Sequence, residues 1–303
     1  MTLKTQKIIS TTLIFFAVAF SFAVLTIIVN LNQPTIFLKT AVVVWLYIWL
    51  KIALLYDLHF KYHGKSKSLT PHMWMDALKD RFDHLLHWKY YSQALIYLLL
   101  PGILFWSTVT LLYVEMGHEK LQYIFAVLST IALTVNYAYI KEAFLRKQEK
   151  LDRDIFIALS VVKVYTSALM FAASISIMRR FCLDPELFVM AIFCIVFLLL
   201  YPALWQHKLI TIKNILYILG ISAVLSLVSY YIYIYWGYNF VTAAIFFAVI
   251  YNLFWGIFHY HLDKALTRKT LFEIILVCAI LAYMVLSITN FRAQIVDGCV
   301  FLR

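Results

Sequence analysis

Three aspartates and three histidines in the segment 71–88 are the densest set of potentially reactive side chains in the sequence. At 100° per residue Asp76, Asp80, Asp83 and His87 fall within a narrow arc of a helix, with His84 beside them. Carboxylate and imidazole groups bind zinc or non-haem iron and act as general acids and bases. The pattern therefore makes Asp76, Asp80, Asp83 and His87 candidate catalytic residues, and His84 and His87 candidate ligands of a divalent metal.

A second set lies at the end of the eighth apolar run, where His259, His261 and Asp263 stand two residues apart. We expect all three on the same side of the membrane as the 71–88 segment, which makes them further candidate metal ligands. The hypothesis requires the three aspartates to lie close to these histidines. Two alternatives remain open for the acidic arc: a solvated face, and a docking face for a protein partner.

Lys163 is the one basic residue deep inside an apolar run, about nine residues from its start. At 1.5 Å per residue it lies roughly 13 Å into the bilayer, too deep for its side chain to reach the surface easily. An ionisable group at this depth is a functional candidate by default, and we count Lys163 among the candidate catalytic residues. The alternative is a hydrogen bond between helices that keeps the amine neutral or paired.

Nine apolar runs, each long enough to cross a bilayer, must position these residues. Each has about 20 mainly apolar residues, as a hydrocarbon core of ~30 Å requires, and none shows the alternation typical of a membrane barrel. They span approximately residues 8–30, 35–56, 93–114, 121–141, 154–178, 187–205, 212–236, 240–261 and 271–290. The sequence therefore predicts an all-α polytopic transmembrane bundle of nine spans, forming a single integral membrane domain over residues 1–303.

The basic residues determine the predicted orientation. With the N-terminus inside, 19 Lys and Arg fall in cytoplasmic segments and five in outer segments. Under the positive-inside rule this places the N-terminus in the cytoplasm and the C-terminus outside, in a bacterial-type inner membrane. Of the net charge of +11, +10 falls in the cytoplasmic segments, where it faces anionic lipid, and nucleic acid is excluded as a partner because no extramembrane segment is long enough to form a domain. Cys182 and Cys299 share the outer side in this topology, where a disulfide is an open alternative to two free thiols.

The longest hydrophilic segment, residues 57–92, joins the second and third spans on the cytoplasmic side. Thr70 before Pro71 is a good N-cap followed by a proline at the first helical position. Apolar residues then share one face opposite the acidic arc: Trp74, Met75, Leu78, Phe82, Leu85 and Leu86. This pattern predicts an interfacial amphipathic helix lying on the membrane.

Several chemistries lack sequence support. The chain has no His-His pair, which membrane desaturases require. After the sixth run it reads Gln206-His207-Lys208, where aspartate-motif prenyltransferases need a second acidic motif. Secondary transporters usually build their binding site from helices that are interrupted by Gly or Pro at corresponding positions of two repeats. Pro101 and Gly102 could interrupt one helix, but the sequence shows no corresponding break in a second repeat, so a transporter is poorly supported. No family is therefore assigned.

The leading functional interpretation is a non-catalytic or lipid-binding membrane component whose cytoplasmic face engages a protein partner. The alternative is a metal-dependent membrane enzyme acting on a lipid-phase substrate, with a transporter as a weaker third choice. Membrane lipid is the expected partner in the first case, and a divalent metal is the expected cofactor in the second.

Overall fold

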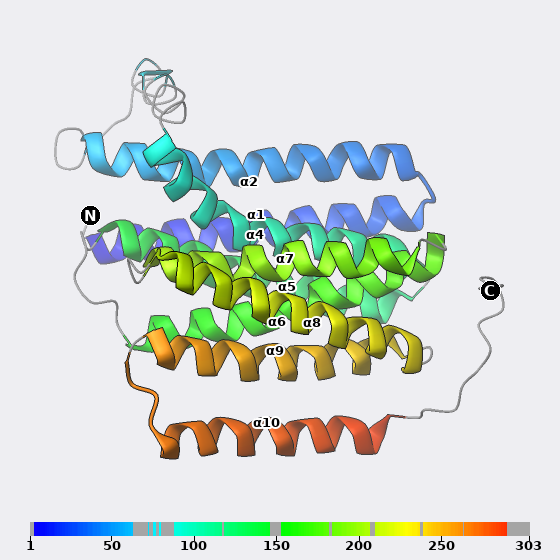
Figure 1. The fold of residues 1–303 in the computed structure, drawn as a ribbon. Helices are drawn as coiled ribbons and strands as arrows, with labels where there is room; N and C mark the ends of the chain where they lie inside the picture. The colour runs from blue at the N-terminus through cyan, green and yellow to red at the C-terminus, as the bar shows by residue number, and fades with distance from the viewer. Residues whose placement is uncertain are drawn as a thin grey trace. The chain divides into compact units, whose positions relative to one another are not determined.

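The computed structural model is all-helical over the residues that it describes (Figure 1). These are residues 3–289 without 63–71, 73–74, 77–78, 80–87, 117, 146–152, 182–183, 207–209, 237–238 and 263. The helices are α1 (Leu3–Asn30), α2 (Pro34–Tyr62), α4 (Trp88–Val114), α5 (Glu119–Leu145), α6 (Arg153–Phe181), α7 (Pro185–Gln206), α8 (Ile212–Tyr235), α9 (Phe240–Leu262) and α10 (Arg268–Ile288). These nine helices of the described chain correspond in order to the nine apolar runs.

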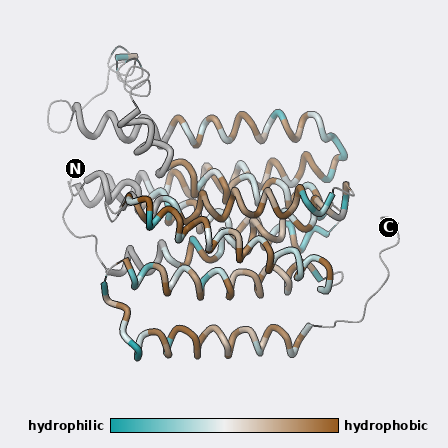
Figure 2. Tube along the Cα trace, viewed as in Figure 1, coloured by the Kyte–Doolittle hydropathy of each residue, from teal (hydrophilic) through white to brown (hydrophobic). Residues whose placement is uncertain are grey.

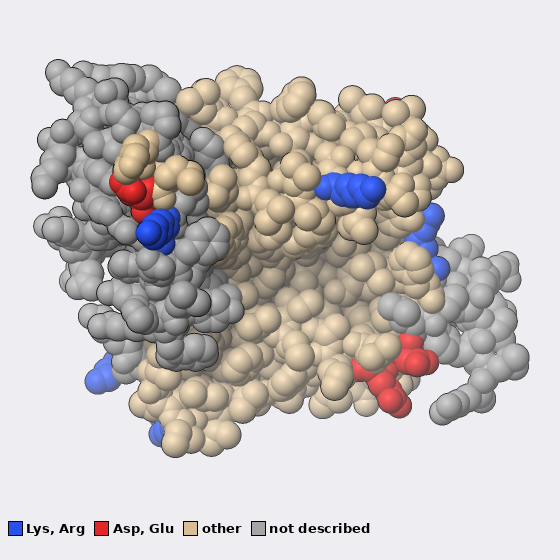
Figure 3. All heavy atoms as spheres, turned by 90° about the horizontal axis from the view of Figure 1, so that it is seen from above, with Lys and Arg blue, Asp and Glu red and all other residues tan. Residues whose placement is uncertain are grey.

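The helices are those of a membrane-embedded protein. Among the described residues, α1, α5, α6, α8, α9 and α10 contain apolar stretches long enough to cross a bilayer. The other three helices contribute apolar segments of 10–17 residues, at Pro34–Leu50, Leu98–Val114 and Pro185–Tyr201. Figure 2 shows apolar residues along most of the length of the helices. Charged side chains are sparse over the described part of the surface seen in Figure 3. The count of nine spans stays a prediction.

The predicted interfacial helix is described only at His72, Met75, Asp76 and Lys79, all of which are helical. His72 Nδ1 lies 3.0 Å from Asp76 Oδ2, one helical turn away. The amphipathic character of the whole segment stays a prediction because its other residues lie outside the described part of the chain.

The chain forms two compact units, unit 1 (Met1–Val162) and unit 2 (Lys163–Arg303), with the boundary inside α6. The predicted organisation as a single domain is not tested by this division. In unit 1, α5 packs against α1, α2 and α4. Phe105 of α4 lies at the centre, and its ring centroid is 5.9 Å from that of Phe22 and 5.6 Å from that of Trp45. Gly102 leaves room for Trp45, since a Cβ there would lie 3.2 Å from the indole.

Polar side chains join the helices of unit 1. Asn30 at the end of α1 donates to Gln122 Oε1 of α5 at 3.1 Å, and Gln122 Nε2 donates to the Leu112 carbonyl of α4 at 2.9 Å. Deeper in the unit, the Thr108 hydroxyl of α4 donates to Ser129 Oγ of α5 at 2.7 Å. In hydrocarbon such hydrogen bonds help to hold helices together, because lipid tails are as apolar as the side chains and the hydrophobic effect does not drive the helices to associate.

In unit 2 α8 packs against α7 and α9, and α10 packs along α9. The core is aromatic: the rings of Phe171 on α6 and Phe247 on α9 stack with centroids 4.2 Å apart, and both are fully buried. Phe188 of α7 contacts Phe171 on one side and Tyr233 of α8 on the other. Threonine N-caps start two helices, with Thr211 Oγ1 accepting from the Asn214 N–H and Thr267 Oγ1 from the Thr270 N–H.

Candidate functional site

Lys163 lies on α6 with its charged end against an aromatic ring of α9. Its Nζ is 4.5 Å from the centre of the Trp255 ring, and the residue is 7% exposed. None of the carboxylates in the described residues forms an ion pair with it. A desolvated cation over a tryptophan face is stabilised by about 2 kcal/mol. The inter-helix contact that holds Lys163 is thus a cation–π contact, where the sequence suggested a hydrogen bond as the alternative to a functional role.

The face of α9 that meets Lys163 continues in both directions as aromatic and imidazole groups. One turn after Trp255, the His259 ring stacks on the indole with centroids 5.5 Å apart and planes at 17°. One turn before it, Tyr251 is completely buried, and its hydroxyl has no hydrogen-bond partner among the described residues. We call Lys163, Tyr251, Trp255 and His259 the α6–α9 cluster. It combines a cation, an imidazole and a phenol in a region without a described acid.

His259 and His261 lie in different surroundings. Residues two apart on a helix project about 200° apart, and the structure shows the consequence. The His259 ring lies on Trp255, whereas the exposed His261 ring meets the edge of Tyr217 on α8, with centroids 6.0 Å apart. Within the described residues, no group of three or more His, Cys, Asp or Glu side chains is arranged to hold a metal ion.

The remaining candidates are only partly placed. Asp76 is half-exposed and hydrogen-bonded to His72. The other acidic and histidine candidates lie outside the described residues, namely Asp80, Asp83, His84, His87 and Asp263. The expected approach of the aspartates to His259 and His261 therefore stays a prediction, as does the disulfide between Cys182 and Cys299, which also lie outside the described residues.

A cluster of cations gathers where α8 begins, α9 ends and α10 begins. The contact of Tyr217 with His261 brings the start of α8 to the end of α9, and Lys213 Nζ lies 5.8 Å from the Tyr217 ring centre. The exposed Lys and Arg side chains in the described residues at this end of unit 2 are Lys213, Lys264, Arg268 and Lys269, and we call these four the basic end. The carboxylate of Glu273 lies 3.9 Å from Lys269 Nζ, one turn into α10.

Lys264, one residue of the basic end, has an uncommon backbone conformation at the C-terminus of α9. Its N–H donates to the His261 carbonyl and the Ala265 N–H to the Tyr260 carbonyl, which is a Schellman motif closing α9. Lys264 accordingly has φ 56°, the left-handed region in which glycine is the usual residue. A side chain there costs roughly 1 kcal/mol relative to glycine. The chain therefore keeps a lysine at a position where its own backbone favours glycine.

Sequence reasoning identified Lys163 and the histidines of α9 but missed the partners that surround them. Trp255 and Tyr251 are two of many aromatic residues in the runs, and no spacing signal separates them from packing residues. Comparison of the chain with protein-family models, with curated proteins and with solved structures finds no match.

Proposed function

We propose that the protein is a non-catalytic, lipid-binding component of the bacterial-type cytoplasmic membrane, spanning it nine times with the N-terminus inside and the C-terminus outside. The observation that carries the proposal is the basic end of unit 2. Four exposed cations lie there beside one described carboxylate, Glu273, at the end of the helices that the charge bias places in the cytoplasm.

Electrostatic attraction to anionic headgroups is the chemistry that this arrangement favours. Each Lys or Arg near an anionic membrane surface contributes about 1 kcal/mol. Four such residues are enough to concentrate anionic lipid around the end of unit 2. Lys264 supports the proposal because its charge is kept at a backbone position that costs stability.

The same proposal assigns the protein partner to the cytoplasmic segment 57–92. Asp76 with Asp80 and Asp83 would present carboxylates there, and a helix that grips anionic lipid would carry Lys and Arg instead. A basic protein surface is the complementary partner, because opposite charges steer association and fix its register.

The test is retention of lipid by the full-length protein. Protein in mixed micelles is exchanged into phosphatidylglycerol or phosphatidylcholine, and bound lipids are counted by native mass spectrometry. We expect preferential retention of phosphatidylglycerol, weakened by salt and reduced when Lys213, Lys264, Arg268 and Lys269 are replaced by Gln.

The matched control carries Lys120→Gln and Arg180→Gln, which neutralise exposed cations at the ends of helices expected to face outward. It should retain phosphatidylglycerol like the wild type. Equal retention of the two lipids by the wild type, or equal losses in both variants, would contradict the proposal.

A further inference from the structure

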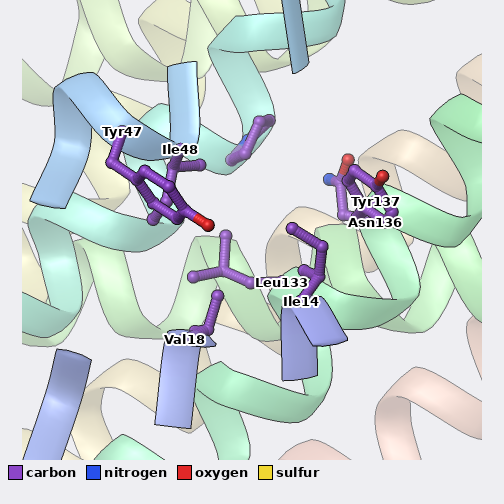
Figure 4. A pocket seen from close by; sticks show the side chains of 8 residues that line it. Ile14, Val18, Tyr47, Ile48, Leu133, Asn136 and Tyr137 are labelled. Atoms are coloured by element: carbon purple, nitrogen blue, oxygen red, sulfur yellow. The ribbon is translucent and has the colours of Figure 1, made fainter. Parts of the chain in front are cut away.

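Unit 1 contains a small pocket between four of its helices (Figure 4). Its volume is about 20 Å³, enough for one oxygen-sized group. The walls are apolar, formed by Val18 of α1, Ile48 of α2, Pro101 of α4 and Leu133 of α5. Asn136 of α5 adds a carboxamide to this lining.

The Asn136 amide is a hydrogen-bond donor without an acceptor. The residue is 2% exposed, and its Nδ2 has no hydrogen-bond partner among the described residues. Tyr47 and Tyr137 also line the pocket, and each takes part in a further interaction. An amide buried in this way loses its hydration without compensation, and most buried polar groups in proteins have a partner. A ligand of this pocket should therefore supply one oxygen atom that accepts a hydrogen bond from Asn136 Nδ2.

The exposed lining residues form the rim of the pocket and indicate the side from which a ligand enters. Ile14 of α1 is partly exposed and Tyr47 of α2 is 40% exposed, whereas the other lining residues are buried. Both rim residues lie in helices α1 and α2, whose outer surfaces face hydrocarbon in a membrane. A water molecule needs two to four polar partners, and in this lining polar side chains come only from Asn136, Tyr47 and Tyr137. A carbonyl oxygen on an apolar molecule needs only one donor.

We propose that this pocket binds the ester carbonyl of a neutral, bilayer-dissolved lipid, which accepts a hydrogen bond from Asn136 Nδ2 while the acyl chain leaves between Ile14 and Tyr47. The inference rests on the proposed lipid-binding function and adds a neutral-ligand site separate from the basic end. The two sites are distinguished by charge, because headgroup retention depends on cations and this pocket contains none.

The test uses methyl oleate, with ¹²C or ¹³C at the carbonyl, added to full-length protein in nanodiscs of ether-linked phosphatidylcholine. Ether lipids have no ester carbonyl, so the isotope difference infrared spectrum reports only the probe. We expect a carbonyl band shifted to lower frequency by the hydrogen bond, saturating at one probe per chain and absent from empty nanodiscs.

Three variants locate the site. Each is compared with the wild type only if its circular dichroism spectrum and its gel-filtration elution volume are unchanged. Asn136→Leu should remove the shifted band and weaken binding roughly 2- to 10-fold, as expected for one hydrogen bond. Val18→Phe keeps the donor but fills the pocket and should abolish binding. Asn252→Leu is the matched control, because Asn252 is the intramembrane asparagine of α9 and already hydrogen-bonds Cys278. It should bind like the wild type.

Loss of the band in all three variants, its persistence in Asn136→Leu, or its absence from the wild type would overturn the proposal. A water molecule retained at Asn136 in the presence of saturating probe would overturn it as well. Retention of phosphatidylglycerol by the wild type is measured without the probe, so failure of this site leaves a distinct signature from failure of the proposed function.

Discussion

Gln122 makes the strongest stability prediction in unit 1, because its side chain joins three helices. It accepts from Asn30 Nδ2 at 3.1 Å and donates to the Leu112 carbonyl at 2.9 Å, and it is fully buried. Leu112 lies in the last turn of α4, where carbonyls have no N–H partner within the helix. Gln122→Leu keeps the volume but removes both hydrogen bonds and leaves that carbonyl unsatisfied.

The expected loss follows from these two terms. Hydrogen bonds between membrane helices average about 0.6 kcal/mol each. An unsatisfied buried carbonyl costs a further ~1–3 kcal/mol. We expect the free energy of unfolding to fall by about 2–4 kcal/mol.

Unfolding is followed by far-ultraviolet circular dichroism while dodecyl sulfate is titrated into mixed micelles. Gln33→Leu is the control, because Gln33 is exposed between α1 and α2. It should change the free energy of unfolding by less than about 0.5 kcal/mol. In a double-mutant cycle with Asn30→Ala the coupling to Gln122 should be about 0.6 kcal/mol. The reasoning is refuted if Gln122→Leu costs no more than Gln33→Leu.

Three further predictions concern unit 2. Phe171→Ala should lower the free energy of unfolding by about 3–5 kcal/mol, because it empties a fully buried site stacked 4.2 Å from Phe247, and a loss near that of a surface substitution would contradict the packing. In denaturation of a double-mutant cycle, Trp255→Leu should cost about 2 kcal/mol more with Lys163 present than with Lys163→Met, and additive effects would exclude the cation–π contact. Metal analysis of detergent-purified protein should find less than one divalent ion per chain, whereas stoichiometric zinc or iron lost with His259→Ala would favour the metal-dependent enzyme.

The helices could be predicted from the sequence because hydrocarbon imposes one solution. Backbone groups have no water to bond in the bilayer, so each long apolar run must form a helix. The nine described helices follow the nine runs with shifts of a few residues, and α6 extends over Arg153–Phe181 where the run covered 154–178. The division of the chain into two units could not be predicted from the sequence, because it depends on which helices pack together and not on composition.

The candidate site was predictable where depth or charge singled out a residue. Lys163 stood out because cations are rare in spans, and the structure shows it buried against Trp255. Helical periodicity separates His259 and His261 onto different sides of α9, which the prediction of a shared metal site did not take into account. The Asn136 pocket could not be predicted, because it depends on how side chains from four helices meet.

The proposed role requires the basic end of unit 2 to face the cytoplasm, and reporter fusions test this most directly. A reporter that is active only in the cytoplasm is fused after Lys147, Lys264 or Arg303 in separate proteins, with expression levels matched. The account predicts activity after Lys147 and Lys264 and none after Arg303, because the basic segments remain inside and the C-terminus lies outside. Inactivity after Lys264, or activity after Arg303, would place these cations away from the cytoplasmic leaflet or change the number of spans, and would contradict the account.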